Sequence, residues 1–270
     1  MKLNEFYKTL DTIAPKSVSD EYCRLFGAYD NSGILLDLGK EVCGALFSLD
    51  LTLRAIEEAE KRGANVIVTH HPAIYAKIGR LDAADLSLGK KLLACAEKGI
   101  SVISMHLNLD CAKGGIDESL MQGVCRASGA AQGNGSSVQI MHKFGEYGYG
   151  RAYDIQPTDL EALKNALESE FCTNRVLLYA NGKKTAGRVA SFCGAGADEE
   201  AVEFALREGA DAIISSDFKH HVLTFANEAG IAVLSLTHYA SENYGFKKYY
   251  EKINHGVAVP CFWHETQAML

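Results

Sequence analysis

Two adjacent histidines end an apolar, β-branched stretch of the sequence, NVIVTHHP, in which His70 and His71 precede a proline. A single histidine at the end of a strand is more often a hydrogen-bonded packing residue than a ligand. The pair becomes informative because two further apolar runs each end on a histidine that an acidic residue follows four positions later. The candidate metal-binding side chains are His70, His71, His106, Asp110, His238 and Glu242.

These side chains offer imidazole nitrogen and carboxylate oxygen, without a thiolate. Such ligands suit zinc, manganese, iron, cobalt or nickel rather than a structural thiolate zinc or a calcium cage. Adjacent residues of a strand point to opposite faces, so His70 and His71 are expected to serve different ions unless the chain turns sharply. A bridging carboxylate would place two metals about 3.5–4 Å apart, the arrangement that activates a shared water in many hydrolases.

The sequence around these residues predicts alternating strands and helices. Apolar runs typical of strands occur at 43–49, 65–69 and 100–105, and runs typical of helices at 52–63, 88–99 and 116–128. Gly63 and Gly99 follow two of these helices, as C-terminal caps should. Alternation with short loops favours an α/β architecture with parallel or mixed sheets.

The second half of the chain repeats this plan. The segment from Ala45 to His71 reappears in outline from Ala190 to His221, with an Ala/Glu-rich helix and a final His-His pair. The similarity of βαβ units in general does not explain matching histidines and acids at strand ends. Ligands bind beyond the carboxyl ends of strands in open α/β sheets. We therefore expect two related α/β halves, 1–130 and 131–270, that face one site.

The region from 134 to 184 is less regular and is too short for an inserted domain of usual size. It predicts strands at 145–155 and 175–182 and, between them, a helix at 157–171 with Pro157 near its start. The stretch GNGSS at 133–137 is expected to be a flexible loop, because neither GxGxxG nor a P-loop lysine follows a strand there.

Composition limits the classes of binding partner that this protein could have. The net charge of −7, with scattered lysines and arginines, provides no electrostatic footprint for duplex nucleic acid. No apolar run approaches the ~20 residues of a membrane span, and the N-terminus indicates an amphipathic helix rather than a signal peptide. We expect a cytoplasmic protein. The eight cysteines, none in a CxxC pair, are expected to be mostly free core thiols.

Five motifs together resemble a known family. YDNSG, THHP, HLNLD, SDFKHH and THYASEN occur in this order, and from about Asn4 onward the chain is similar to the NGG-one-interacting factor three-like proteins. Bacterial members of this dinuclear-metal family are often labelled GTP cyclohydrolase I type 2. The short central region resembles the shorter members, and Tyr29 stands where tryptophan is frequent. The resemblance implies two α/β halves around a metal cleft and a homohexamer.

The resemblance also implies how two divalent metals share their ligands. His71 and Asp110 would bind one metal, His70 and His238 would bind the other, and Glu242 would bridge both. His106 would lie beside the site, either as a residue that supports the ligands or as an occasional ligand. The motif residues expected to line the same cleft are Asp30, Asn31, Gly33, Asp217, Lys219 and His221.

Two functions are compatible with such a centre. The first is a metal-dependent hydrolase, GTP cyclohydrolase-like, that acts on a nucleotide or a similar small polar substrate. His106, Lys219 and His221 are its candidate catalytic residues and would shuttle protons or hold the substrate. Three protein ligands for each metal leave a position open for water, as in catalytic sites. The second function is a metal-binding regulatory or scaffold protein without turnover.

Overall fold

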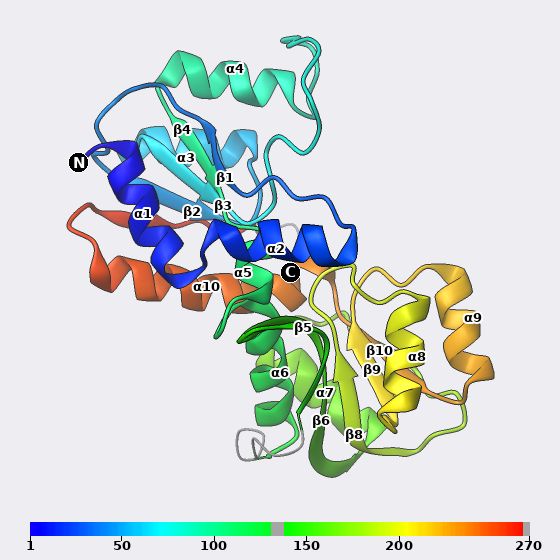
Figure 1. The fold of residues 1–270 in the computed structure, drawn as a ribbon. Coiled ribbons are helices and arrows are strands. Elements are labelled where there is room, and N and C mark those ends of the chain that lie inside the picture. The colour runs from blue at the N-terminus through cyan, green and yellow to red at the C-terminus, as the bar shows by residue number, and fades with distance from the viewer. Residues whose placement is uncertain (131–137, 267–270) are drawn as a thin grey trace. The chain divides into compact units, whose positions relative to one another are not determined.

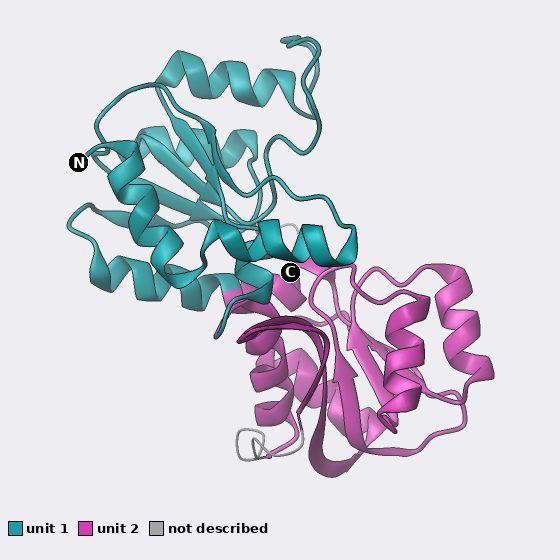
Figure 2. Ribbon diagram, in the orientation of Figure 1, with its two compact units in different colours: residues 1–113, 246–266 teal, residues 114–245, 267–270 magenta. Residues whose placement is uncertain are grey.

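The structure, a computed structural model, describes residues 1–130 and 138–266, so the expected loop at 133–137 lies outside the described residues. The chain divides into two compact units, residues 1–113 with 246–266 and the described part of residues 114–245 (Figure 2). These bounds differ from the expected boundary at residue 130. The difference arises because helix α6 (Ile116–Ala127) packs on strands and a helix of the second unit, and the C-terminal strand pairs within the first.

The first unit is built on a five-stranded mixed sheet (Figure 1). Its order in space is β1 (Gly33–Leu36), β4 (Ser101–Ser104), β3 (Val66–Thr69), β2 (Ala45–Ser48) and β11 (Cys261–Trp263). Strand β1 runs antiparallel to β4, and the other pairs are parallel. The three strands expected here are confirmed.

Helices cover both faces of this sheet. Helices α3 (Leu53–Lys61) and α4 (Gly89–Lys98) bury side chains of β2, β3 and β4 on one face. On the other face Phe47 contacts Phe246 and Tyr249 of α10 (His238–Gly256), and Tyr249 donates a hydrogen bond to the Leu10 carbonyl of α1 (Leu3–Ile13). Helices α2 (Lys16–Phe26) and α5 (Leu107–Cys111) also belong to this unit. The strands are therefore buried on both faces, as their continuous apolar runs require.

The second unit contains a six-stranded mixed sheet. Its order is β5 (Gln139–Phe144), β6 (Tyr147–Asp159), β8 (Thr185–Ser191), β9 (Ala212–Ser215), β10 (Ala232–Ser235) and β7 (Leu177–Tyr179). The three strands β8, β9 and β10 are parallel. Helices α8 (Glu199–Arg207) and α9 (His220–Glu228) pack together, as do α6 and α7 (Leu160–Glu170) (Figure 1). The mixed α/β class is confirmed.

The central helix begins later than expected. Pro157 still belongs to β6, and Asp159 is the N-cap of α7. The Asp159 side chain accepts hydrogen bonds from the backbone N–H groups of Glu161 and Ala162. A carboxylate cap of this kind satisfies the first free donors of a helix, which fixes the start at Leu160 rather than beside the proline.

The strand-helix-strand units β2–α3–β3 and β8–α8–β9 share their order and their parallel pairing, as the predicted repeat requires. The two His-His pairs, however, are not equivalent. His70 and His71 follow β3 directly, whereas His220 and His221 open α9 after an intervening loop. The positions directly after β9 hold Ser216 and Asp217. That part of the expected correspondence is wrong.

The cysteines are free thiols, and five of them, Cys95, Cys111, Cys125, Cys193 and Cys261, are buried as expected. Cys43 and Cys172 are exposed. Among the described residues, no helix combines the length and the apolar character that crossing a membrane would require.

Candidate metal centre

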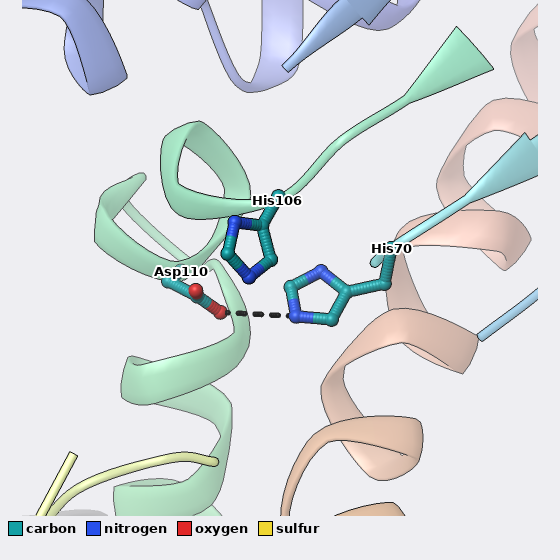
Figure 3. Close-up of side chains that lie close together, drawn as sticks. All are labelled: His70, His106 and Asp110. Atoms are coloured by element: carbon teal, nitrogen blue, oxygen red, sulfur yellow. Dashed lines mark ion pairs between the residues drawn. The ribbon is translucent and has the colours of Figure 1, made fainter. Parts of the chain in front are cut away.

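Three potential ligands of the first unit converge at the carboxyl ends of β3 and β4 (Figure 3). One ligand atom from each of His70, His106 and Asp110 lies within 4.8 Å of the others. His70 and Asp110 are buried. His70 follows β3, His106 precedes α5, and Asp110 lies on α5. We call these three residues, together with His71, the first half-site.

The two adjacent histidines lie on a turn rather than in the strand. The backbone N–H groups of His70 and His71 both donate to the Leu49 carbonyl, at 3.2 and 3.0 Å. The centroids of the two rings are only 5.0 Å apart. The chain turns directly after Thr69, which is the exception that the expectation allowed, so strand alternation does not separate these two side chains.

Each histidine of the first half-site has its Nδ1 atom held by an oxygen. The partners are the Met105 carbonyl for His70 at 2.8 Å, Asp50 for His71 at 2.7 Å and Asp30 for His106 at 2.7 Å. Carbonyl and carboxylate oxygens accept hydrogen bonds, so each Nδ1 carries the proton. In a neutral ring this leaves the lone pair on Nε2, which is the state that a metal-binding histidine requires.

Asp30 is itself fixed. Burial raises the pKa of its carboxyl, but the hydrogen bond and charge of His106 and the hydroxyl of Ser32 outweigh this effect and lower the pKa to about 2. The Ser32 hydroxyl donates to Asp30 at 2.6 Å and accepts the backbone N–H of His106 at 3.1 Å. Asp30 is therefore ionised at neutral pH and orients the His106 ring.

The second unit holds a similar arrangement, which we call the second half-site: His238 and Glu242 at the start of α10. The Nδ1 atom of His238 lies 2.6 Å from Asp217 Oδ2, and its Nε2 atom lies 3.0 Å from Glu242 Oε2. Asp217 adopts a left-handed φ of 52°, which is uncommon outside glycine and occurs often at functional sites. Glu242 is buried.

The distances between imidazole and carboxylate fit bound cations. His70 Nε2 lies 3.5 Å from Asp110 Oδ1, and His238 Nε2 lies 3.0 Å from Glu242 Oε2. Two lone-pair atoms repel at these distances unless a proton or a metal ion lies between them. Ligands of one tetrahedral metal, with bonds of about 2.1 Å, lie about 3.4 Å apart. The donor set fits a nitrogen- and oxygen-ligated divalent metal in both half-sites. The spacing in the first half-site matches this distance, whereas the 3.0 Å contact in the second is also the length of an N–H···O hydrogen bond.

The other predicted residues lie at the starts of α9 and β1 and in the loop before β1. Lys219 is the N-cap residue of α9, and His221 lies 3.0 Å from Glu199 on α8, where both side chains are more than half exposed. The Asn31 side chain donates to the Ile74 carbonyl at 2.6 Å, and Gly33 begins β1. Lys219 and His221 thus stay predictions as catalytic residues.

Asp50 was missed by the sequence reasoning. It follows β2 in the stretch SLDLT and holds His71. The signal was present, because Asp50 is an acid at the carboxyl end of a parallel strand, the same position that marks the histidines.

The sequence is similar to several curated proteins. A protein of Clostridium perfringens named GTP cyclohydrolase 1 type 2 homolog is 29% identical over 248 residues, which are 90% of this chain and 87% of that protein. One of the same name from Methanocaldococcus jannaschii is 28% identical over 253 residues, 93% of this chain and 94% of that protein.

Solved structures share the fold. A Staphylococcus aureus protein superposes with a TM-score of 0.81 at 22% identity and covers 100% of this chain and 99% of its own. A Bacillus cereus protein related to NIF3 has a TM-score of 0.80 at 18% identity, with coverages of 98% and 97%. The family model Duf34/NIF3 (NGG1p interacting factor 3) matches residues 1–267. The chain therefore belongs to the Duf34/NIF3 family.

Proposed function

We propose that the two half-sites form one dinuclear centre of a metal-dependent hydrolase. The observation that carries the proposal is the pair of close approaches between an imidazole Nε2 atom and a carboxylate oxygen, 3.5 Å in the first half-site and 3.0 Å in the second. Each of these histidines has its Nδ1 atom held by an oxygen acceptor. Both half-sites are thus oriented for cations rather than for packing.

The bridging role of Glu242 is what the family resemblance implies. Its carboxylate is buried and lies 3.0 Å from Nε2 of His238.

Bound divalent metals would lower the pKa of a water molecule and turn it into a nucleophile at neutral pH. The chain's own residues contribute the rest. Asp30, Asp50 and Asp217 hold the histidine rings in one orientation and one tautomer. His106, whose Nδ1 proton is held by Asp30, is either a ligand or the group that moves a proton at Nε2.

Two exposed tyrosines support a planar substrate, such as a nucleotide base. Tyr29 and Tyr75 are 57% and 53% exposed and lie edge to face, with 5.2 Å between ring centroids. The Tyr75 hydroxyl donates to the Tyr29 carbonyl at 3.3 Å. Tyr29 directly precedes Asp30, which holds His106 of the first half-site. Exposed aromatic rings stack on planar bases.

The proposal is tested by assay of metal-loaded protein against GTP and a panel of phosphoesters. We expect turnover that Glu242→Gln abolishes and, if the ring stacks on a base, a KM for GTP that Tyr29→Ala raises roughly 5- to 100-fold. Tyr179→Ala, which alters an exposed tyrosine of β7, is the control and should leave KM unchanged. Tight ligand binding without turnover would instead indicate the regulatory or scaffold protein.

Replacement of either histidine of the adjacent pair should remove one bound metal ion. We expect His70→Ala and His71→Ala each to lose about one metal equivalent, because each ring is oriented for coordination through Nε2. Elemental analysis after dialysis measures the content. The variant His106→Ala distinguishes the two roles of His106. If His106 is a ligand, the variant loses metal; if His106 moves a proton, the variant keeps its metal and loses turnover. Full occupancy in both single variants would show that the pair only packs.

The assembly and the location stay predictions of the family resemblance. We propose a homo-oligomer, a hexamer by resemblance, in the cytoplasm, with a small-molecule substrate as its partner rather than duplex nucleic acid or a membrane.

A further inference from the structure

A glycine lies directly against the carboxylate of the second half-site. Gly194 follows β8 and has a left-handed φ of 58°. A Cβ atom added to Gly194 would lie 2.1 Å from Glu242 Oε1 and 3.5 Å from His238 Cε1. Real Cβ atoms do not approach an oxygen this closely, so any side chain at position 194 requires that Glu242 move.

The backbone of Gly194 is held from several directions. Its N–H group donates to the Ser241 hydroxyl at 3.1 Å, and that hydroxyl donates to the His238 carbonyl at 2.8 Å. Its carbonyl accepts from the hydroxyls of Ser216 at 2.6 Å and Ser215 at 3.2 Å. Because these serines are buried, the loop cannot retreat without the loss of buried hydrogen bonds.

The loop is also anchored one residue earlier. The Tyr149 hydroxyl donates to the Cys193 carbonyl at 2.5 Å, and the Cys193 N–H donates to Asp117 at 3.2 Å. Gly196, two residues further on, packs so closely on Tyr149 that an added Cβ atom would lie 1.7 Å from its hydroxyl oxygen. The loop is therefore held in place beside Glu242 by hydrogen bonds and close packing.

We propose that Gly194 is a positioning residue of the metal centre, whose backbone fixes the conformation in which Glu242 presents its carboxylate. This inference rests on the proposed function for its metal readout, but its structural part concerns Glu242 alone. The absence of a side chain lets the loop close on the carboxylate, and the serine hydroxyls keep it closed.

The test compares Gly194→Ala with Gly209→Ala. Gly209 also lies in the second unit and has a left-handed φ of 69°, but no atom lies within 4 Å of an added Cβ. Both variants carry the same backbone strain, and only Gly194→Ala displaces Glu242. We expect zinc and manganese affinity, measured by competition with a chelator, to fall about 10- to 100-fold in Gly194→Ala. In Gly209→Ala it should stay within about twofold of wild type.

A milder variant and a direct structural measurement complete the test. Ser241→Ala removes the hydroxyl that joins Gly194 to His238 and should weaken metal binding by about tenfold. A crystal structure of metal-free Gly194→Ala should show the Glu242 carboxylate displaced. An unmoved carboxylate, or equal losses of affinity in the two glycine variants, would overturn the proposal. If the wild-type protein binds no metal but the Glu242 carboxylate is still displaced in Gly194→Ala, the proposed function is overturned and the structural part of this inference stands.

Discussion

Replacement of Glu242 by alanine is expected to release both metal ions and to lower the melting temperature of the holoprotein. Only a carboxylate side chain offers two oxygens that can contact two cations at once, so the bridging position proposed for Glu242 should be the hardest to replace. Bound ions stabilise the folded state by mass action, by about 2.7 kcal/mol at a free metal concentration 100 times Kd.

Metal content and thermal unfolding measure this effect together. Chelation should lower the melting temperature of the wild type but leave that of Glu242→Ala unchanged, because the variant has no metal to lose. Asp110→Ala should lose mainly one metal. Glu251→Ala, at an exposed position of the same helix, is the control and should retain both ions. Equal losses in the Glu242 and Asp110 variants, or two metals retained in Glu242→Ala, would show that Glu242 does not bridge.

Local pattern was sufficient to predict most elements and the residues near the strand ends. The strands before His70 and His106 are continuous apolar runs, and the acids four residues after His106 and His238 lie on helices that start near these histidines. Such features depend on side-chain period and on strand ends, both of which are visible in a single sequence.

Features that depend on backbone hydrogen bonds or on the close approach of distant residues could not be predicted from the sequence. The shared acceptor at Leu49 turns the chain at His70 and His71, which the alternation rule for strands does not describe. The expected correspondence of the two His-His pairs is wrong because a four-residue loop separates β9 from α9. Gly194 looks like any loop glycine in the sequence, and only its 2.1 Å approach to Glu242 reveals its role.

A buried ion pair in the second unit carries the largest expected effect on stability. Asp117 and Arg151 are both buried and form an ion pair. Asp117 also accepts the backbone N–H groups of Gly150 at 3.0 Å and Cys193 at 3.2 Å. Asp117→Ala would leave a buried guanidinium without its counter-charge, which costs about 3–5 kcal/mol of unfolding free energy. The free energy lost by leaving one buried charge unpaired exceeds the net free energy that the intact ion pair contributes to stability.

We therefore expect Asp117→Ala to lower the melting temperature of the metal-free protein by roughly 6–20 °C. Asp154→Ala is the matched control, because Asp154 pairs with Arg188 at 2.7 Å in the same unit but its side chain is 58% exposed. An exposed pair contributes only about 0–1 kcal/mol, so this variant should melt close to the wild type. Asp117→Ala combined with Arg151→Met removes both charges and should recover part of the loss, while the two backbone N–H groups still lack their acceptor. Melting temperatures that fall equally in the Asp117 and Asp154 variants would contradict the argument, because burial would then make no difference to the value of the charge.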